Sequence, residues 1–228
     1  MSFSLIVPVA SDKYEYENKI PDVFLFDKEG IPFCIKSILG LELNKFDCIY
    51  FTILKSHDEK YCLKELLKLQ FMRLGIVNAN VIVLDNPTKS QSETIYETIQ
   101  KAKITGSIYI KDADCSFTGE VLPHNGVAIY PLEKLSMVNP QHKSYVTVDE
   151  MYYITNIIEK KIISHYFNAG GYIFEDVNLY CKYFEKYRHH DGLCLSHIIY
   201  SMLLDRQIFR PILVDNYIDF ENCGNEKN

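Results

Sequence analysis

The chain has 228 residues, of which 47% are hydrophobic, and it carries a formal net charge of −6 at pH 7. This length fits one domain with a substantial core, and the hydrophobic fraction excludes a disordered chain. The acidic balance argues against a dedicated nucleic-acid-binding protein, which usually carries a basic stripe. No apolar run approaches the roughly 20 residues of a spanning helix and the N-terminus has no signal-peptide pattern, so we expect no membrane partner.

The cysteines indicate a reducing compartment. There are seven of them, an odd number, and none forms a Cys-x-x-Cys pair. Most have apolar neighbours, which is typical of reduced thiols in a protein core. We therefore expect a cytoplasmic protein without disulfides, and the ligand spacing of a zinc site is missing.

Apolar runs alternate with amphipathic stretches across the first half of the chain. Short β-rich runs predict strands at 5–9, 48–54, 80–84 and 107–110. Helical spacing predicts helices at 35–41, from 63 to a stop near Gly75, and at 94–102, with 56–59 as a helix cap. Strands that alternate with helices of this length favour parallel pairing with helices on both faces of the sheet.

The second half has a different pattern. Strands are predicted at 127–130, 144–148, 152–158 and 211–214, and helices at 177–187 and 193–205. Because no long helix separates the first three of these strands, we expect antiparallel additions to the sheet. The predicted fold is one three-layer, doubly wound α/β domain over residues 1–220, with a mixed, mainly parallel sheet and a flexible polar tail at 221–228.

Carboxylates follow two of the predicted strands. Asp112-Ala113-Asp114 comes after the strand at 107–110, and Asp219 lies shortly after the strand at 211–214. α/β folds bind ligands at the carboxyl ends of their strands, and Mg²⁺ prefers one or two carboxylates together with substrate phosphates. These aspartates therefore indicate a nucleotide enzyme with a magnesium ion, although aspartates in such places also cap ordinary turns.

Two further segments offer ligand-binding groups. Thr88 to Thr94 places small hydroxyls and one amide at a helix N-terminus, which suits a nucleotide or simply a helix cap. Phe167 to Phe174 contains Asn168 and two adjacent glycines, which let a backbone approach a ligand or form a tight turn before a strand.

The order of these pieces resembles the sugar-phosphate nucleotidyltransferases, and more narrowly the small nucleotidyltransferases encoded with bacterial capsule and surface-polysaccharide genes. Residues 88–94 are similar to the family's Thr-x-Gly-Gln-Ala-x-Thr segment. Asp114 follows the fourth strand as the family's first metal-binding aspartate does, and Asp219 matches the aspartate of the Trp-x-Asp-x-Gly-Thr turn. Glu159-Lys160 and 167–174 resemble the family's Glu-Lys-Pro and Asn-Ala-Gly-x-Tyr-x-Phe stretches.

The resemblance implies a nucleotide-diphospho-sugar transferase-like fold and a Mg²⁺-dependent reaction. A nucleoside monophosphate would pass from a nucleoside triphosphate to a phosphorylated sugar or a similar small acceptor, releasing pyrophosphate. The implied metal ligands are Asp114 and Asp219, and the implied acceptor-binding residues are Glu159, Lys160, Asn168 and Gly170. The implied nucleotide-binding residues are Val9, Ala10, Ser11, Gln91, Ser92, Thr94 and Asp112. The resemblance does not decide which base the nucleoside triphosphate carries or whether the chain forms a homodimer.

The N-terminal phosphate loop departs from the family pattern. The family has a glycine-rich loop with an arginine, followed by Pro-Lys-Pro, and these groups neutralise the triphosphate. Here no glycine precedes Gly30 and no arginine precedes Arg73, while Asp22 follows Pro21 where the lysine is expected. Lys13 and Lys19 are the lysines expected to act as the catalytic cations instead, as point charges without the fork of an arginine.

Two other functions remain open on the sequence. Asp112-x-Asp114 is also the signature by which glycosyltransferases hold a metal and a nucleotide-sugar, and Phe167 to Gly170 is similar to a turn of glycogenin-like transferases. The altered N-terminal loop also leaves open a non-catalytic relative that binds a nucleotide. The order of Gln91, Glu159-Lys160 and 217–220 favours the nucleotidyltransferase.

Overall fold

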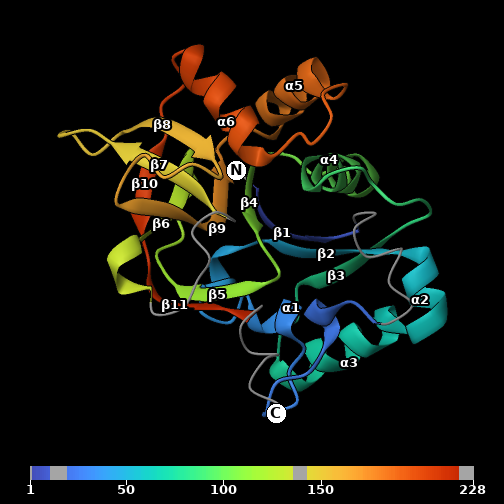
Figure 1. Cartoon of the computed structure of the whole chain (residues 1–228). Coiled ribbons are helices and arrows are strands. Elements are labelled where there is room, and N and C mark those ends of the chain that lie inside the picture. The colour runs from blue at the N-terminus through green and yellow to red at the C-terminus, as the bar shows by residue number, and fades with distance from the viewer. Residues whose placement is uncertain (1, 11–19, 136–142, 221–228) are drawn as a thin grey trace.

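The computed structural model describes residues 2–10, 20–135 and 143–220, and Figure 1 shows their arrangement. The predicted tail lies outside these ranges. The core of the fold is a sheet in the order β10-β6-β9-β4-β1-β2-β3, to which β7 and β8 are added. This mixed sheet confirms the predicted fold class.

Four parallel strands form one half of the sheet, as predicted. They are β1 (Phe3–Val9), β2 (Cys48–Leu54), β3 (Ala79–Leu84) and β4 (Ser107–Lys111). Leu5 of β1 lies between Ile49 of β2 and Tyr109 of β4 in register. These strands are apolar on both faces because helices cover both sides.

Antiparallel pairing defines the other half. β9 (Tyr166–Phe174) runs antiparallel to β4 and to β6 (Gly126–Pro131), and β10 (Arg210–Leu213) extends the sheet beyond β6. β7 (Ser144–Val148) pairs with β9 and with β8 (Ile154–Glu159). β5 (Cys115–Thr118) and β11 (Asp215–Asp219) form a separate two-stranded ribbon.

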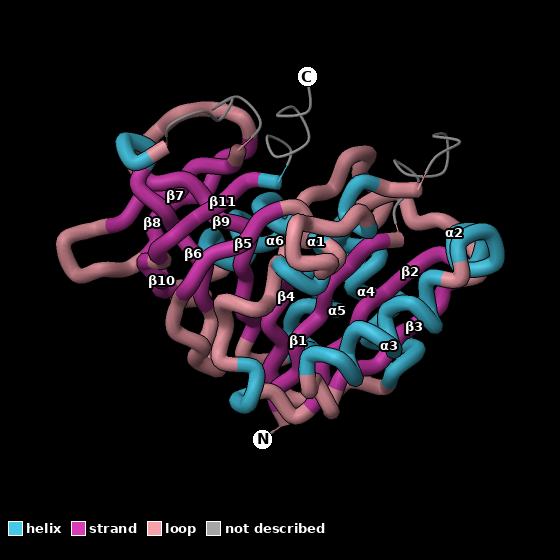
Figure 2. The backbone as a smooth tube through the Cα atoms, turned by 90° about the horizontal axis from the view of Figure 1, so that it is seen from below, coloured by secondary structure: helices cyan, strands magenta, loops and turns pink. Residues whose placement is uncertain are grey.

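Helices cover the two faces of the sheet (Figures 1 and 2). α1 (Phe33–Lys36), α2 (Lys55–Tyr61) and α3 (Leu63–Leu74) lie on one side. α4 (Gln91–Ala102), α5 (Val177–Tyr187) and α6 (Leu195–Leu204) lie on the other. Successive side chains of β1 point to opposite faces of the sheet, so the core has two layers. Leu5 packs in the cluster with Phe71 of α3, whereas Ile6 packs in the cluster with Ile95 of α4.

Two local predictions and one alternative were wrong. The helix expected at 35–41 stops at Lys36, and Gly40 follows in a turn where a Cβ atom would stand 2.0 Å from the carbonyl oxygen of Phe117. The expected cap at 56–59 lies inside α2. The tight turn before a strand, given as an alternative for 167–174, is not formed, because this whole segment belongs to the single strand β9, which shifts its register against β6 and accommodates Gly170 at φ +81°.

Candidate active site

The topology places a crevice at the carboxyl end of β4. The chain winds outward from β1 to β2 and β3 on one side, while β4 lies on the other side of β1. Such a switch point is where open α/β sheets bind ligands. A cavity of about 190 Å³ lies there. Its described polar lining comes from separate segments: Gln91, Asp112, Asp114, Lys143, Ser144, Glu159, Asn168, Ser196 and Tyr217.

Asp112, Gln91 and Gly170 meet at one wall of this cavity. The Asp112 backbone N–H donates to the carbonyl oxygen of Gly170 at 2.9 Å, which continues the pairing of β4 with β9. Gln91, the first residue of α4, donates from Nε2 to Oδ1 of Asp112 at 2.5 Å. The structure thus brings together predicted residues from a helix start and two strands.

The two neighbouring aspartates raise each other's negative potential, and the charges of Lys111 and Lys143 offset this only in part for Asp112. Burial, and then the charge of Asp114, raise the pKa of Asp112 to about 6. The carbonyl oxygen of Asp114 accepts a hydrogen bond from the Phe220 backbone at 2.8 Å, which ties this turn to the end of β11. Its carboxylate lines the cavity without a hydrogen bond to another described side chain.

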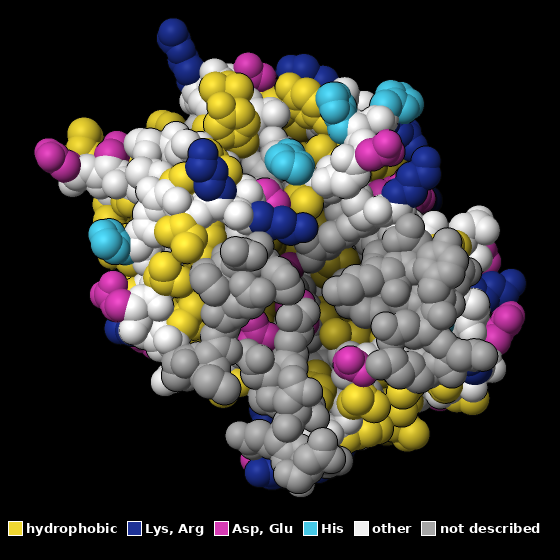
Figure 3. Space-filling view, in the orientation of Figure 1, with side chains coloured by type: hydrophobic (Ala, Val, Ile, Leu, Met, Phe, Trp, Pro, Cys, Tyr) yellow, Lys and Arg dark blue, Asp and Glu magenta, His cyan; other side chains and the backbone are white. Residues whose placement is uncertain are grey.

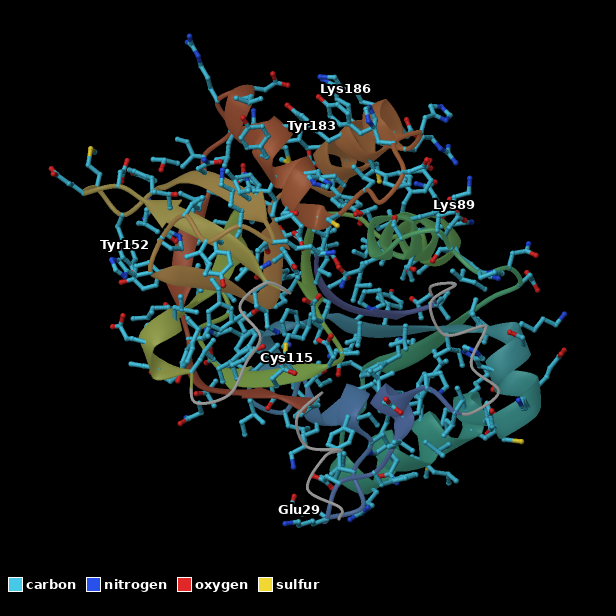
Figure 4. All side chains as sticks on the ribbon, in the orientation of Figure 1. Glu29, Lys89, Cys115, Tyr152, Tyr183 and Lys186 are labelled. Atoms are coloured by element: carbon cyan, nitrogen blue, oxygen red, sulfur yellow. The ribbon has the colours of Figure 1, made fainter. Side chains whose placement is uncertain are left out.

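A buried lysine, which the sequence reasoning missed, closes the turn that carries these aspartates. Lys111 is fully buried, and its Nζ donates to the carbonyl oxygens of Asp112 and Cys115 at 2.9 Å each. Nζ also lies 3.1 Å from Sγ of Cys115, a residue at the centre of the molecule in Figure 4. Burial raises the pKa of the Cys115 thiol to about 12, so the thiol stays protonated at neutral pH. A lysine at the end of an otherwise apolar strand was the available signal.

Two more of the predicted acceptor-binding residues, Glu159 and Asn168, also line the cavity. Glu159 accepts a hydrogen bond on Oε2 from the Ser196 hydroxyl at 2.7 Å. Asn168 accepts from the Gly170 backbone at 2.9 Å and donates from Nδ2 to the Ser144 hydroxyl at 3.2 Å. Lys160 is exposed at φ +56°, and its side chain does not belong to the described lining of the cavity.

Lys143 is a second residue that the sequence reasoning missed. Its Nζ donates to Oδ2 of Asp219 and to the hydroxyl of Tyr217, at 2.8 Å each. Burial would lower the pKa of Lys143, but the hydrogen bond and the charge of Asp219 raise it above its usual value. The ammonium is therefore charged, and it neutralises the carboxylate of Asp219.

This ion pair bears on the predicted magnesium site. Asp114 offers a carboxylate to the cavity, but the carboxylate of Asp219 is engaged by Lys143. Within the described ranges, no group of three or more His, Cys, Asp and Glu side chains is placed to hold a metal ion. As they stand in this structure, the residues do not fit a magnesium ion shared by the two aspartates.

The remaining predicted residues lie away from the described lining. Ser92 and Thr94 are buried in α4, and the carbonyl oxygen of Ala10 accepts a hydrogen bond from the Thr88 hydroxyl at 2.9 Å. Val9 is buried in the core. Ser11, Lys13 and Lys19 fall outside the residues that the structure describes, so their roles stay predictions.

Charged groups of both signs are interspersed on the face shown in Figure 3, and its described side chains form no extended basic stripe. Among the described residues, no helix is long and apolar enough to cross a membrane.

No protein-family model matches the sequence, and a comparison with curated proteins found no match. Solved structures do match. A nucleoside-diphosphate-sugar pyrophosphorylase from Vibrio cholerae RC9 is 15% identical, with 95% of this chain and 94% of that chain covered and a TM-score of 0.74. The inositol-1-phosphate CTP transferase from T. maritima is 16% identical, with coverages of 96% and 87% and a TM-score of 0.72.

A third similar structure is a UDP-glucose pyrophosphorylase complexed with UDP-glucose. It is 12% identical, with 96% of this chain and 94% of that chain covered and a TM-score of 0.67. The match extends over nearly the whole chain in all three cases, including the antiparallel half. The chain therefore has the nucleotide-diphospho-sugar transferase fold that these nucleotidyltransferases share.

Proposed function

We propose that this chain is a nucleotidyltransferase that moves a nucleoside monophosphate from a nucleoside triphosphate to a phosphorylated sugar or a similar small acceptor. One observation carries the proposal: a single cavity at the carboxyl end of β4 contains Gln91, Asp112, Asp114, Glu159 and Asn168. The resemblance assigned these residues to the nucleotide, the metal and the acceptor. The similar structures, which include a CTP transferase and two pyrophosphorylases, support the same reaction class.

The reaction needs little covalent chemistry from the protein. An oxygen of the acceptor phosphate attacks the α-phosphorus of the triphosphate, a new P–O bond forms, and the bond to the departing pyrophosphate breaks. Positioning the two substrates in line provides most of the acceleration. Glu159 and Asn168 have oxygen atoms at the cavity wall that suit acceptor hydroxyl groups, and Gln91 lies where the resemblance places the nucleotide.

Magnesium dependence stays a prediction. A bound Mg²⁺ would neutralise charge on the phosphates, and Asp114 is the described carboxylate that remains available to it. A cytoplasmic location and a role in surface-polysaccharide synthesis rest on the sequence alone, and are proposed on that basis.

A ligand panel tests the proposal. Wild-type protein is heated with each of five nucleoside triphosphates and with several nucleotide-sugars, with and without magnesium. A ligand present at 100 times its dissociation constant adds about 2.7 kcal/mol to the native state, which gives a clear rise in Tm. Stabilisation by one triphosphate supports nucleotidyl transfer and identifies the base. No stabilisation by any triphosphate contradicts it.

A glycosyltransferase is the second candidate, and it rests on one observation. Asp112 and Asp114 both line the same cavity, as expected for residues that hold a nucleotide diphosphate-sugar. The same panel separates the two functions, because stabilisation by a nucleotide-sugar without any response to triphosphates would favour glycosyl transfer.

A further inference from the structure

The cavity has an unfavourable charge for the substrates of the proposed reaction. Three carboxylates line it, those of Asp112, Asp114 and Glu159, and Lys143 is its one lysine or arginine among the described residues. Phosphate groups that enter such a space are repelled unless a cation faces them. The positive charge of Lys143 is therefore the feature of the described lining that suits a phosphate.

The position of Lys143 leaves part of its ammonium available. An ammonium has three N–H donors, and the structure assigns two of them, to Asp219 and Tyr217. The side chain is 18% exposed and reaches the cavity. Among the described residues no partner is given for the third donor, so it can meet a ligand while the other two hold the group in place.

Contacts with two separate segments fix the residue. The carbonyl oxygen of Lys143 accepts a hydrogen bond from the Lys160 backbone at 2.9 Å, at the end of the β7–β8 pair. The hydroxyl of Tyr217 accepts a hydrogen bond from the Lys143 ammonium. The ring of Tyr217 packs against Phe167, with ring centroids 5.2 Å apart. A charged group held in this way loses little conformational entropy when it binds an anion.

We propose that the Lys143 ammonium binds a phosphate group of the substrate, and that Asp219 holds this ammonium instead of a metal ion. The phosphate in question follows from the proposed function, on which the inference rests. Lys143 then supplies a cation at the cavity. The sequence has no glycine-rich phosphate loop with an arginine that could supply one. In this proposal Asp219 holds the Lys143 ammonium and does not act as a metal ligand.

Inorganic phosphate is a suitable probe, titrated in the absence of magnesium and followed by ³¹P NMR. K143M removes the charge and keeps the length of the side chain, and we expect its phosphate affinity to fall about tenfold or more, because a hydrogen bond to a charged group is lost. K143R should retain most of the affinity. K28M, at an exposed lysine without a hydrogen bond to another described residue, is the matched control and should bind as the wild type does.

In the K143M variant the buried carboxylate of Asp219 loses the ammonium of Lys143. Removing one partner of a buried ion pair destabilises the fold. The double variant K143M/D219N removes both charges and leaves the net charge of the pair unchanged. Its phosphate affinity should still be about tenfold lower than that of the wild type. Wild-type affinity in either variant overturns the proposal, and so does a wild-type protein that does not bind phosphate.

Manganese binding, followed by electron paramagnetic resonance, tests the second half of the proposal. K143M/D219N, which leaves the net charge of the pair unchanged, should change the Mn²⁺ affinity less than about threefold relative to the wild type, and a loss of tenfold would show that Asp219 is a metal ligand. The outcomes also separate this inference from the proposed function. A wild type without nucleotidyl transfer, but with phosphate binding that K143M abolishes, refutes only the function. Transfer by a protein whose K143M variant still binds phosphate normally refutes only the inference.

Discussion

Gly170 and Asp112 are in direct contact across the β4–β9 pair. A Cβ atom added at Gly170 would stand 2.8 Å from Oδ2 of Asp112 and 2.9 Å from Sγ of Cys115. Gly170 also has φ +81°, a conformation that residues with a Cβ atom rarely adopt. The missing side chain of Gly170 thus leaves room for the Asp112 carboxylate, and the carbonyl oxygen of Gly170 accepts the hydrogen bond of the Asp112 backbone.

The first prediction concerns this contact. G170A should lower the free energy of unfolding by about 2–4 kcal/mol, because it combines the strained backbone with a clash at the half-buried carboxylate of Asp112. G75A is the matched control: Gly75 has φ +69° but nothing within 4 Å of an added Cβ atom, so only about 1 kcal/mol should be lost. Urea unfolding of both variants measures the difference, and equal losses would show that the contact with Asp112 is not tight.

The raised pKa of Asp112 predicts a pH dependence of stability. The native state retains this proton up to pH about 6, whereas the unfolded state releases it near the ordinary value of 3.8. Between these values the native state binds more protons, so this group makes the free energy of unfolding fall as pH rises, by at most about 1.4 kcal/mol per pH unit. The loss is essentially complete about one pH unit above this pKa, near pH 7.

D112N removes this titration. The difference in the free energy of unfolding between wild type and D112N, measured by urea unfolding at several pH values, should change between pH 4 and pH 6 and be constant above pH 7. A difference that stays constant over the whole range would contradict the raised pKa.

Glu159 is expected to act on the acceptor. E159Q keeps an oxygen that can accept the Ser196 hydrogen bond, so the fold should be preserved, but it removes the negative charge. We expect the KM for the acceptor to rise about tenfold with a smaller change for the triphosphate, because a hydrogen bond to a charged group contributes about 1.5–3 kcal/mol. E120Q, at an exposed glutamate away from the cavity lining, is the control. Equal effects on both substrates would place Glu159 elsewhere in the reaction.

Much of the fold could be predicted from the sequence because its parallel strands are buried on both faces. The run from Cys48 to Leu54 is continuously apolar or β-branched, and the structure gives a strand with these bounds. The ribbon of β5 and β11 could not be predicted. β5 has four residues, and β11 begins with Asp215 and Asn216, which are typical of turns.

The candidate site was predicted in part for a similar reason. Strand-end carboxylates and the Asn168-Gly170 segment can be recognised locally, and the structure brings them together. Lys143 could not be recognised, because its partner Asp219 is 76 residues away and polar residues surround it in the sequence. Its role depends on a tertiary contact that no local pattern reports.

The measurement that tests the central claim most directly is pyrophosphate release by wild type, D114N and the control D191N, with each triphosphate combined with several phosphorylated sugars. Asp191 is exposed and does not belong to the cavity lining. We predict release only when both substrates are present, and a loss of about 100-fold or more in D114N. D114N should keep its stability, since removing a charge that raises the pKa of Asp112 relieves repulsion. Wild-type rates in D114N, or no release from the wild type with any pair, would contradict the account.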